Sequence, residues 1–162
     1  MPNWCQNYVE LQHPDKSKVE DLVVASGKNK DFGLFQYLYP CPKEELESEG
    51  GGYGWRVENW GTKWDVKPDD IEFDGDSVRI SFDTAWSPPI ALYDMLTQEG
   101  WTVNAQYAES GMQFCGQYQD GYDEYFEYGD MSRDEAKENI PSDLYEFADL
   151  DYCYDYQEES DE

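Results

Sequence analysis

Basic residues are scarce in this chain of 162 residues, which has 11 Lys and Arg against 37 Asp and Glu and a formal net charge of −26. Phosphate groups would be repelled by such a chain, so we expect no direct binding to nucleic acid or to an anionic membrane. The excess of acid instead favours a basic protein partner, a cation, or a role in solubility alone.

Histidine and closely spaced cysteines are also rare. The single His13 stands in a turn before Pro14, and the four cysteines form no CxxC pair, which excludes a zinc finger or ribbon by spacing. The acids in residues 69–76 lack the order of a calcium-binding EF-hand loop. The first residues have no basic start followed by an apolar run, so we expect no signal peptide. We therefore expect no catalytic residue, metal or cofactor, and free thiols in a reducing cytoplasm.

Apolar and aromatic residues are sufficient for a folded domain, at 39% and 17% of the chain. Their spacing predicts the order strand, helix, strand, strand, helix, strand, followed by one added strand. This is the split βαβ pattern of an α+β ferredoxin-like sandwich, in which two helices cover one face of an antiparallel sheet. The expected strands lie at about 4–11, 71–73, 78–82, 101–107 and 112–116, and the expected helices at about 15–26 and 87–99.

Composition also predicts how the chain is divided. We expect a ferredoxin-like domain over residues 1–118, with an inserted loop at about 28–58 that is acidic and rich in glycine. Residues 119–162 read as an acidic, aromatic-rich extension, and the tail from about 155 as disordered.

Local signals mark the ends of several elements. Residues 74–76, Asp-Gly-Asp, predict a hairpin turn. Ser87 is expected to cap the second helix, with Pro88 at the first helical position. Ser132 and Glu135 have the spacing of a capping box and predict a short helix in the extension.

Two short stretches, residues 59–65 and 82–89, hold three Trp residues beside Thr, Lys and Asp, and we expect both to border strands that lie side by side. One interpretation is a ligand surface, where Trp rings stack a planar or sugar-like group and Lys and Asp bind its polar atoms. The other is that these residues pack the sheet and satisfy one another. The candidate residues are Trp60, Lys63, Trp64, Asp65, Thr84 and Trp86.

Five strings of residues resemble the YubB-like family of plasmid and phage proteins. They are Met-Pro-Asn-Trp-Cys-Gln-Asn at 1–7, Trp-Gly-Thr-Lys-Trp-Asp at 60–65, Phe-Asp-Thr-Ala-Trp-Ser-Pro-Pro at 82–89, Tyr-Ala-Glu-Ser-Gly at 107–111 and Phe-Cys-Gly at 114–116. The resemblance covers roughly residues 1–118. It implies a ferredoxin-like domain, in agreement with the element order, and a mobile genetic element expressed inside a bacterial cell. It implies no reaction.

The extension interleaves acids with aromatic residues in a way that predicts a partner-binding surface. Residues 109–162 contain 18 acidic and 2 basic residues, and so a net charge of −16. Carboxylates held along a ridge can present a field similar to that of DNA, and aromatic residues can anchor the contact. The candidate residues are Asp120, Asp123, Glu124, Glu127 and Asp130, with Tyr122, Tyr125 and Tyr128 between them.

These observations predict a non-enzymatic protein of a phage or plasmid, located in the cytoplasm of the host cell. It would bind a basic, nucleic-acid-binding host protein and act as a DNA mimic that inhibits a nuclease or defence factor. Two alternatives stay open. One is a small-ligand binding protein or enzyme that uses the two Trp stretches, and the other is a structural component of a virion. The sequence does not determine the oligomeric state.

Overall fold

The structure of the protein is a computed structural model that describes residues 2–161, and it contains one antiparallel sheet of six strands in the order β2-β3-β1-β4-β5-β6. Met1 of the first family-like string and Glu162 of the expected tail lie outside the described residues. The strands are β1 (Trp4–Gln12), β2 (Asp70–Phe73), β3 (Ser77–Ala85), β4 (Thr102–Glu109), β5 (Phe114–Gln119) and β6 (Tyr122–Glu127).

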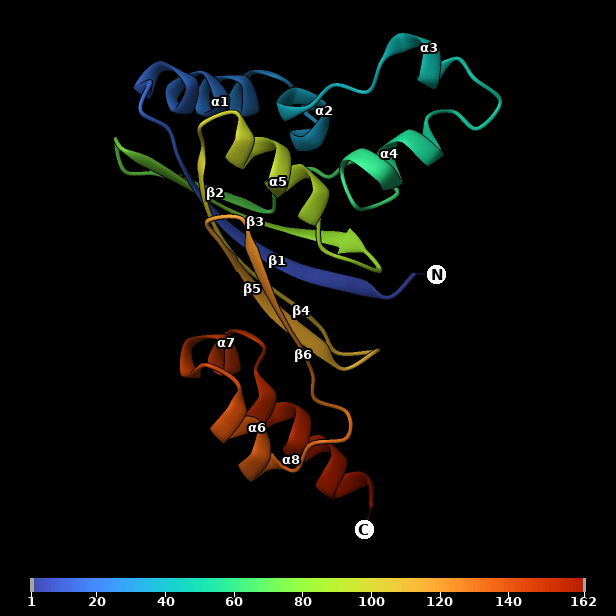
Figure 1. Ribbon diagram of the computed structural model, residues 1–162, viewed down its shortest axis with the longest axis vertical. Helices are drawn as coiled ribbons and strands as arrows, with labels where there is room; N and C mark the ends of the chain where they lie inside the picture. The colour runs from blue at the N-terminus through green and yellow to red at the C-terminus, as the bar shows by residue number, and fades with distance from the viewer. Residues whose placement is uncertain (1, 162) are drawn as a thin grey trace.

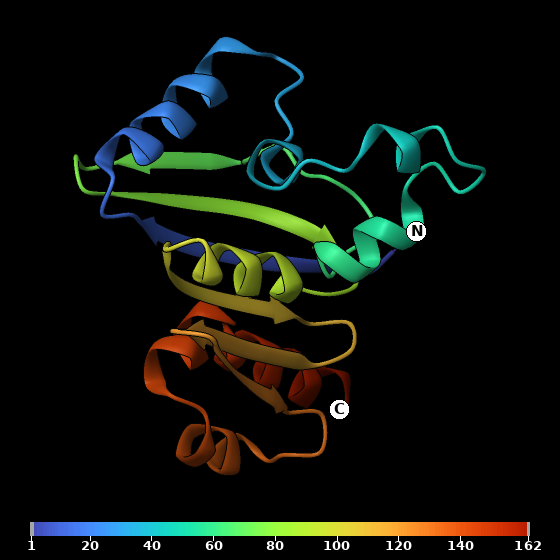
Figure 2. The same ribbon diagram turned by 45° about the horizontal axis from the view of Figure 1, so that its top comes forward.

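The first four strands and two helices confirm the ferredoxin-like arrangement. Helix α1 (Lys16–Lys28) follows β1 and helix α5 (Ile90–Gln98) follows β3, so each βαβ unit returns to the same sheet. Figure 1 shows α1 and α5 on one side of the sheet, and the turned view in Figure 2 agrees. The Asp-Gly-Asp hairpin between β2 and β3 is also confirmed, with Gly75 at φ 97°.

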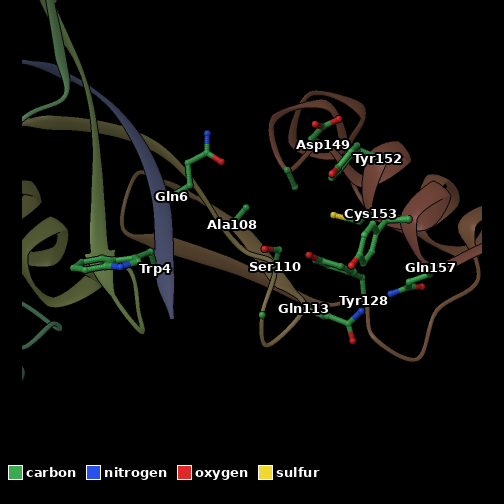
Figure 3. Close-up of a pocket in the computed structure, with 13 residues that line it drawn as sticks. Trp4, Gln6, Ala108, Ser110, Gln113, Tyr128, Asp149, Tyr152, Cys153 and Gln157 are labelled. Carbon is green, nitrogen blue, oxygen red and sulfur yellow. The ribbon is translucent and has the colours of Figure 1, made fainter. Parts of the chain in front are cut away.

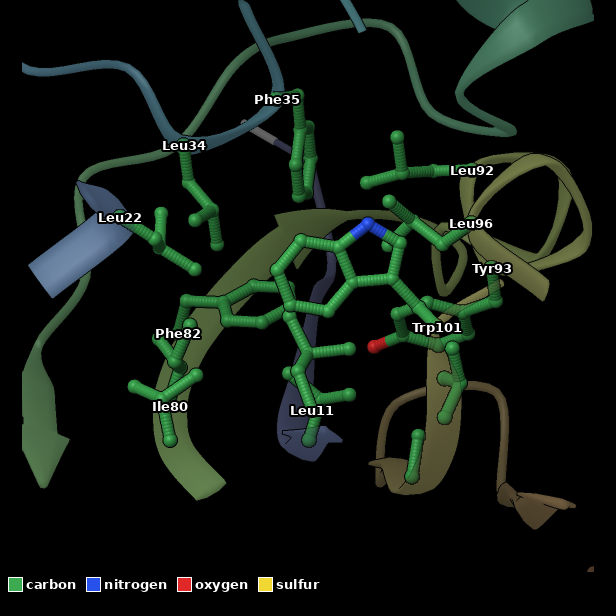
Figure 4. Packing of buried hydrophobic residues seen from close by; sticks show 14 of the residues in the cluster. Leu11, Leu22, Leu34, Phe35, Ile80, Phe82, Leu92, Tyr93, Leu96 and Trp101 are labelled. Atoms are coloured by element: carbon green, nitrogen blue, oxygen red, sulfur yellow. The ribbon is translucent and has the colours of Figure 1, made fainter. Parts of the chain in front are cut away.

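The main core lies between this helical layer and the sheet. Every second residue of β3 faces the helices, because successive side chains of a strand point to opposite faces. Figure 4 shows how side chains from both layers gather around the indole of Trp101. The buried residues drawn there include Leu11, Ile80 and Phe82 from strands and Leu22, Leu92 and Leu96 from helices.

The segment between α1 and β2, where an inserted loop is expected at about 28–58, is not a plain loop. It contains three short helices, α2 (Leu34–Leu38), α3 (Lys43–Leu46) and α4 (Tyr53–Asn59). Residues 60–65 form a bend and coil between α4 and β2, and the strand that follows them is β2.

The expectation of one added strand after β4 is also corrected, because β5 and β6 both join the sheet. Asp120 and Gly121 both have positive φ, 53° and 85°, which matches the two-residue turn of a tight hairpin. The domain therefore does not end at residue 118. Helices α6 (Arg133–Asn139), α7 (Ser142–Phe147) and α8 (Leu150–Ser160) follow and lie on the other side of the sheet (Figure 1).

This second helical layer has its own buried cluster. Ala108 of β4 and Cys115 of β5 pack beneath Leu144 of α7 and Leu150 of α8. The expectation of a disordered tail from about 155 is wrong for the residues described, since α8 continues to Ser160. Ser132 caps α6 by accepting a hydrogen bond from the Glu135 N–H (3.2 Å), which confirms the N-cap and the short helix.

Several further properties bear on the choice of a site. All four cysteines are free thiols, and burial raises the pKa of Cys5 and Cys115 to about 12, which disfavours the thiolate. Among residues 2–161, no three or more His, Cys, Asp and Glu side chains form a group that could hold a metal ion. None of the helices described has both the length and the apolar character needed to span a bilayer.

Candidate functional site

The Trp60–Asp65 stretch begins inside the core. Trp60 is 1% exposed, and its indole N–H donates to the Tyr39 carbonyl (2.9 Å). Its ring meets Phe35 and Trp55 edge to face, with centroids 5.6 and 5.8 Å away. Trp60 therefore closes the core under the inserted helices and is not accessible to a ligand.

Asp65, at the end of this stretch, holds α2 in place. Its carboxylate accepts from the N–H groups of Phe35 (2.8 Å), Gln36 (3.2 Å) and Val66 (2.7 Å), so it supplies the cap that α2 lacks in its own preceding residue. Burial raises the pKa of Asp65, while these three N–H groups oppose the shift. The side chain serves the fold.

A chain of hydrogen bonds joins the second stretch to the first. Asn7 donates to the Thr84 hydroxyl (2.8 Å), which donates to the Ser87 carbonyl (2.7 Å). Ser87 in turn donates from its own hydroxyl to the Gly61 carbonyl (2.7 Å). The expectation that Ser87 caps a helix is wrong, because α5 begins at Ile90 after Pro89. The two Trp stretches are adjacent, and their polar groups mainly satisfy one another.

The exposed members of the candidate ligand surface are Trp64 and Trp86, and Lys63 is half-buried beside Trp64. The Lys63 ammonium lies 4.1 Å from the centre of the Trp64 ring, and Trp64 also lies 6.3 Å from the ring of Trp4. Trp86 is 46% exposed at a φ of 70°, a conformation that bulky residues rarely adopt. These three and Trp4 remain available for contact.

The acidic-aromatic candidates divide between the two faces of β6. Asp123 accepts from the Tyr107 hydroxyl (2.6 Å), and Tyr128 is buried at 2% exposure, so these two serve packing. Asp123, Tyr125 and Glu127 point to one face of the strand and Tyr122 and Glu124 to the other, because side chains alternate. The exposed members are Asp120, Tyr122, Tyr125, Glu127 and Asp130. They border an edge strand and do not form one continuous ridge.

The strongest concentration of exposed acid lies on the second helical layer. The sequence predicts a short helix and a disordered tail in this region. Its two basic residues are both paired with acids of α8. Arg133 contacts Asp155 (2.5 Å) and Glu158 (3.7 Å), and Lys137 contacts Asp151 (3.7 Å). The exposed acids without such a pair are Asp134, Glu135, Glu138, Asp143, Glu146, Asp149, Glu159 and Asp161.

A cleft of about 740 Å³ lies between α8 and the part of the sheet near the start of β1, and the sequence did not predict it. Figure 3 shows Trp4 and Gln6 of β1 on one side and Tyr152 and Cys153 of α8 on the other. The one available signal was the spacing of Tyr152 and Tyr156, which puts both rings on one helical face; they stack with centroids 6.5 Å apart. Trp4 was identified only as part of the first strand.

Comparison with protein families agrees with the fold. The family model described as "Ferredoxin-like domain in Api92-like protein" matches residues 60–148, which is more than half of the chain. The crystal structure of a protein api92 from Yersinia pseudotuberculosis is similar with a TM-score of 0.45 and 11% sequence identity, over 82% of this chain and 100% of that chain. No curated protein matches the chain.

Proposed function

The chain belongs to the family of Api92-like proteins with a ferredoxin-like domain, and from this premise we propose that it is a non-enzymatic protein that binds a basic surface of another protein. The observation that carries the proposal is the charge of the C-terminal third. Residues 109–162 hold 18 acidic and 2 basic residues, and residues 133–160 of this segment form three helices packed on the sheet.

The packing matters because it fixes the carboxylates in space. Leu144, Leu150 and Tyr154 are buried against the sheet, so the polar faces of α6, α7 and α8 are held towards solvent. Arg133 and Lys137 are already paired within the layer. The remaining field is negative, and it would accelerate encounter with a basic protein and repel phosphate.

The finer proposal is that the protein acts as a DNA mimic in a bacterial cytoplasm, on behalf of a phage or plasmid, and inhibits a nuclease or another defence factor. The resemblance to the YubB-like family supports the genetic context, and the ordered acids support the mimicry. Tyr122 and Tyr125, exposed beside Asp120, Glu127 and Asp130 on edge strand β6, would supply aromatic anchors.

The first prediction tests the acidic layer with a matched pair of variants. The test variant replaces four exposed acids of α6 and α7, D134N, E138Q, D143N and E146Q. The control removes the same charge from the insertion, with E44Q, E45Q, E47Q and E49Q. Both proteins and the wild type are used to capture partners from a bacterial lysate at low and at moderate salt.

We expect the wild type and the control to retain a basic protein that moderate salt or added double-stranded DNA releases, and the test variant to lose most of it. Screening by salt weakens contacts between exposed charges, which is the physical reason for the salt dependence. A partner that is not basic and that DNA does not displace would contradict the proposal, as would equal loss in both variants.

A second candidate is a small-ligand binding protein that uses Lys63, Trp64 and Trp86, favoured by the exposure of both indoles and by the Lys63 ammonium beside Trp64. Deletion of residues 119–162 does not separate the two candidates, because it would uncover Ala108 and Cys115. The triple variant K63A/W64A/W86A does so: the second candidate requires it to lose function, and the acidic-layer proposal does not. A virion component would instead be found in purified particles.

A further inference from the structure

The cleft between β1 and α8 has the features of a binding site that neither the family match nor the charge distribution assigns. Its volume of about 740 Å³ is in the range of ligand pockets. Tyr152 and Tyr156 of α8, each 64% exposed, form an aromatic wall, and Trp4, 49% exposed, stands on the sheet side with its ring turned away from α8 (Figure 3).

A buried hydroxyl without a hydrogen bond lines this cleft. Tyr128 is 2% exposed, and its hydroxyl group has no hydrogen-bond partner among the described residues. The neighbouring Cys153 thiol is a weak partner at best. Figure 3 shows the Tyr128 side chain between Ser110, on the turn after β4, and Cys153, on α8. A buried polar group left unsatisfied is costly, so a ligand with a polar group at this point would remove that cost.

The charge of the lining restricts the occupant. The lining has no basic residue, and its one charged side chain is Asp149. The Asp149 carboxylate makes no ion pair and no capping bond among residues 2–161, although the residue precedes α8 and is held at a φ of 51°. An anionic ligand is therefore disfavoured, and a cationic group that donates hydrogen bonds is favoured.

Arginine meets these requirements better than lysine does. Its guanidinium group is planar, carries five N–H donors and stacks on aromatic rings, whereas the lysine ammonium is a compact, strongly hydrated charge. The cleft offers an aromatic wall together with separate acceptors, which are the carboxylate of Asp149, the hydroxyl of Tyr128 and the amide oxygens of Gln6, Gln113 and Gln157.

We propose that the cleft binds an arginine-bearing segment of the basic partner. The guanidinium group stacks on an aromatic wall of the cleft. The N–H donors of the guanidinium and of the segment backbone are directed to Asp149 and Tyr128. This inference rests on the proposed function, because it names how the acidic protein recognises its basic partner. The acidic layer supplies long-range attraction, and the cleft supplies selectivity for arginine.

The surface on the other side of Trp4 supports a segment longer than one residue. Two smaller hollows, of about 390 and 220 Å³, share the Trp4 wall and are both lined by Asp69 and Asp83. Neither carboxylate forms an ion pair within residues 2–161. Burial and the nearby charge of Asp69 raise the pKa of Asp83, as expected for acids without a cation beside them. A second basic residue of the segment would reach them.

The second prediction is tested with two peptides, four Gly-Arg repeats and four Gly-Lys repeats, added to the full-length protein. Binding is followed by the indole N–H resonance of Trp4, assigned with W4F, and by calorimetry. We expect the arginine peptide to shift this resonance and to bind at least threefold more tightly than the lysine peptide.

Two variants and their matched controls locate the contact. Y128F removes the unsatisfied hydroxyl and should lower the affinity for the arginine peptide about five- to tenfold. Y93F removes the other unsatisfied tyrosine hydroxyl, in the main core, and should leave binding unchanged. D149N should weaken binding about tenfold, and D143N, the same charge change outside the cleft, should have a smaller effect.

The outcomes separate this inference from the function on which it rests. If both peptides bind equally and the Trp4 resonance does not move, the cleft is not the site, although the acidic layer still binds basic chains. If Y128F and Y93F bind the arginine peptide with equal affinity, the proposal that the cleft is the binding site is also contradicted. If neither peptide binds at low salt, both the proposed function and the cleft fail.

Discussion

At the scale of single residues, similar tryptophans of one motif have opposite roles. Trp60 and Trp64 are four positions apart, but Trp60 is 1% exposed in the core and Trp64 is 43% exposed beside Lys63. The difference arises because α4 ends at Asn59, so Trp60 still turns inward while the following residues leave the helix. A sequence pattern that does not fix where a helix ends cannot assign these roles.

The third prediction contrasts two tryptophans by their effect on stability. W60A should lower the free energy of unfolding by about 3–5 kcal/mol, because it leaves a large cavity and an unsatisfied Tyr39 carbonyl. W86G should change the free energy of unfolding by less than about 1 kcal/mol. Glycine adopts the left-handed backbone of residue 86 without the strain of about 1–2 kcal/mol that tryptophan has there, and this gain offsets the lost contacts. Urea unfolding followed by circular dichroism measures both.

If W86G destabilises the protein as much as W60A, then Trp86 is a packing residue and its exposed ring is not available for function. If W60A is nearly neutral, then Trp60 does not close the core as its burial indicates. Fluorescence is a poor probe here, because both variants remove a tryptophan.

At the scale of elements, the fourth prediction concerns two glycines with open space around them. A Cβ added at Gly27 or at Gly121 would meet no atom within 4 Å, so crowding does not decide either substitution. Gly121 lies at φ 85° in the β5–β6 turn, whereas Gly27 lies inside α1. G121A should therefore destabilise the protein by about 1–2 kcal/mol, and G27A should stabilise it by about 0.5–1 kcal/mol.

The measurement is thermal and urea unfolding of the two single variants and of the double variant. The sites lie in different elements and a Cβ at either meets no atom within 4 Å, so the two effects should add. A stabilising G121A would mean that β5 and β6 are not joined by the tight turn, and a destabilising G27A would mean that α1 ends before residue 27, as its sequence alone indicated.

The elements that could be predicted were those with strong periodicity. The alternation in β3 and the apolar stripe of α5 identified the ferredoxin-like order, because both elements bury one face in the main core. Strand β6 was missed although Asp120-Gly121 is a standard hairpin signal, since its acids and tyrosines indicated an exposed extension.

Helix α8 was missed for a different reason. Its composition is that of a disordered tail, and only Leu150 and Tyr154 are buried in it. Its stability depends on tertiary contacts, such as the Tyr154 hydroxyl that donates to the Met131 carbonyl (3.0 Å) and the ion pairs of Arg133 with Asp155 and Glu158. Partners distant in sequence leave no local pattern. The cleft formed by α8 was unpredictable for the same reason.

At the scale of the whole molecule, the sheet separates two layers with different tasks. The layer of α1 and α5 covers the main core, while the layer of α6–α8 covers only part of the opposite face and carries much of the acid (Figure 2). A net charge of −26 opposes the folded state through self-repulsion. The protein therefore keeps a charge that costs stability, which is consistent with a role for that charge in binding.

The fifth prediction is that stability rises as the pH falls from 7 towards about 5. Burial raises the pKa of Asp65, Asp83 and Asp123 above the ordinary 3.8. The folded state therefore binds more protons than the unfolded chain in this window, and protonation favours folding. Hydrogen bonds lower the pKa of Asp74 and Asp151, so these two groups oppose the rise only as the pH approaches the unfolded value of 3.8, where the unfolded chain begins to bind protons.

Two variants attribute this slope to its cause. D83N should be more stable than the wild type at pH 7 and should show a shallower rise, because it lacks a carboxyl whose pKa is raised by burial and by Asp69. D74N should be less stable at pH 7, because Asp74 accepts from Ser77 and contacts Arg79 (3.1 Å), and should keep the slope. Urea midpoints at pH 7, 6 and 5 distinguish these cases. A stability that falls over this range would mean that lowered carboxyl pKa values dominate, and that the acidic surface is better paired with cations than the ion pairs indicate.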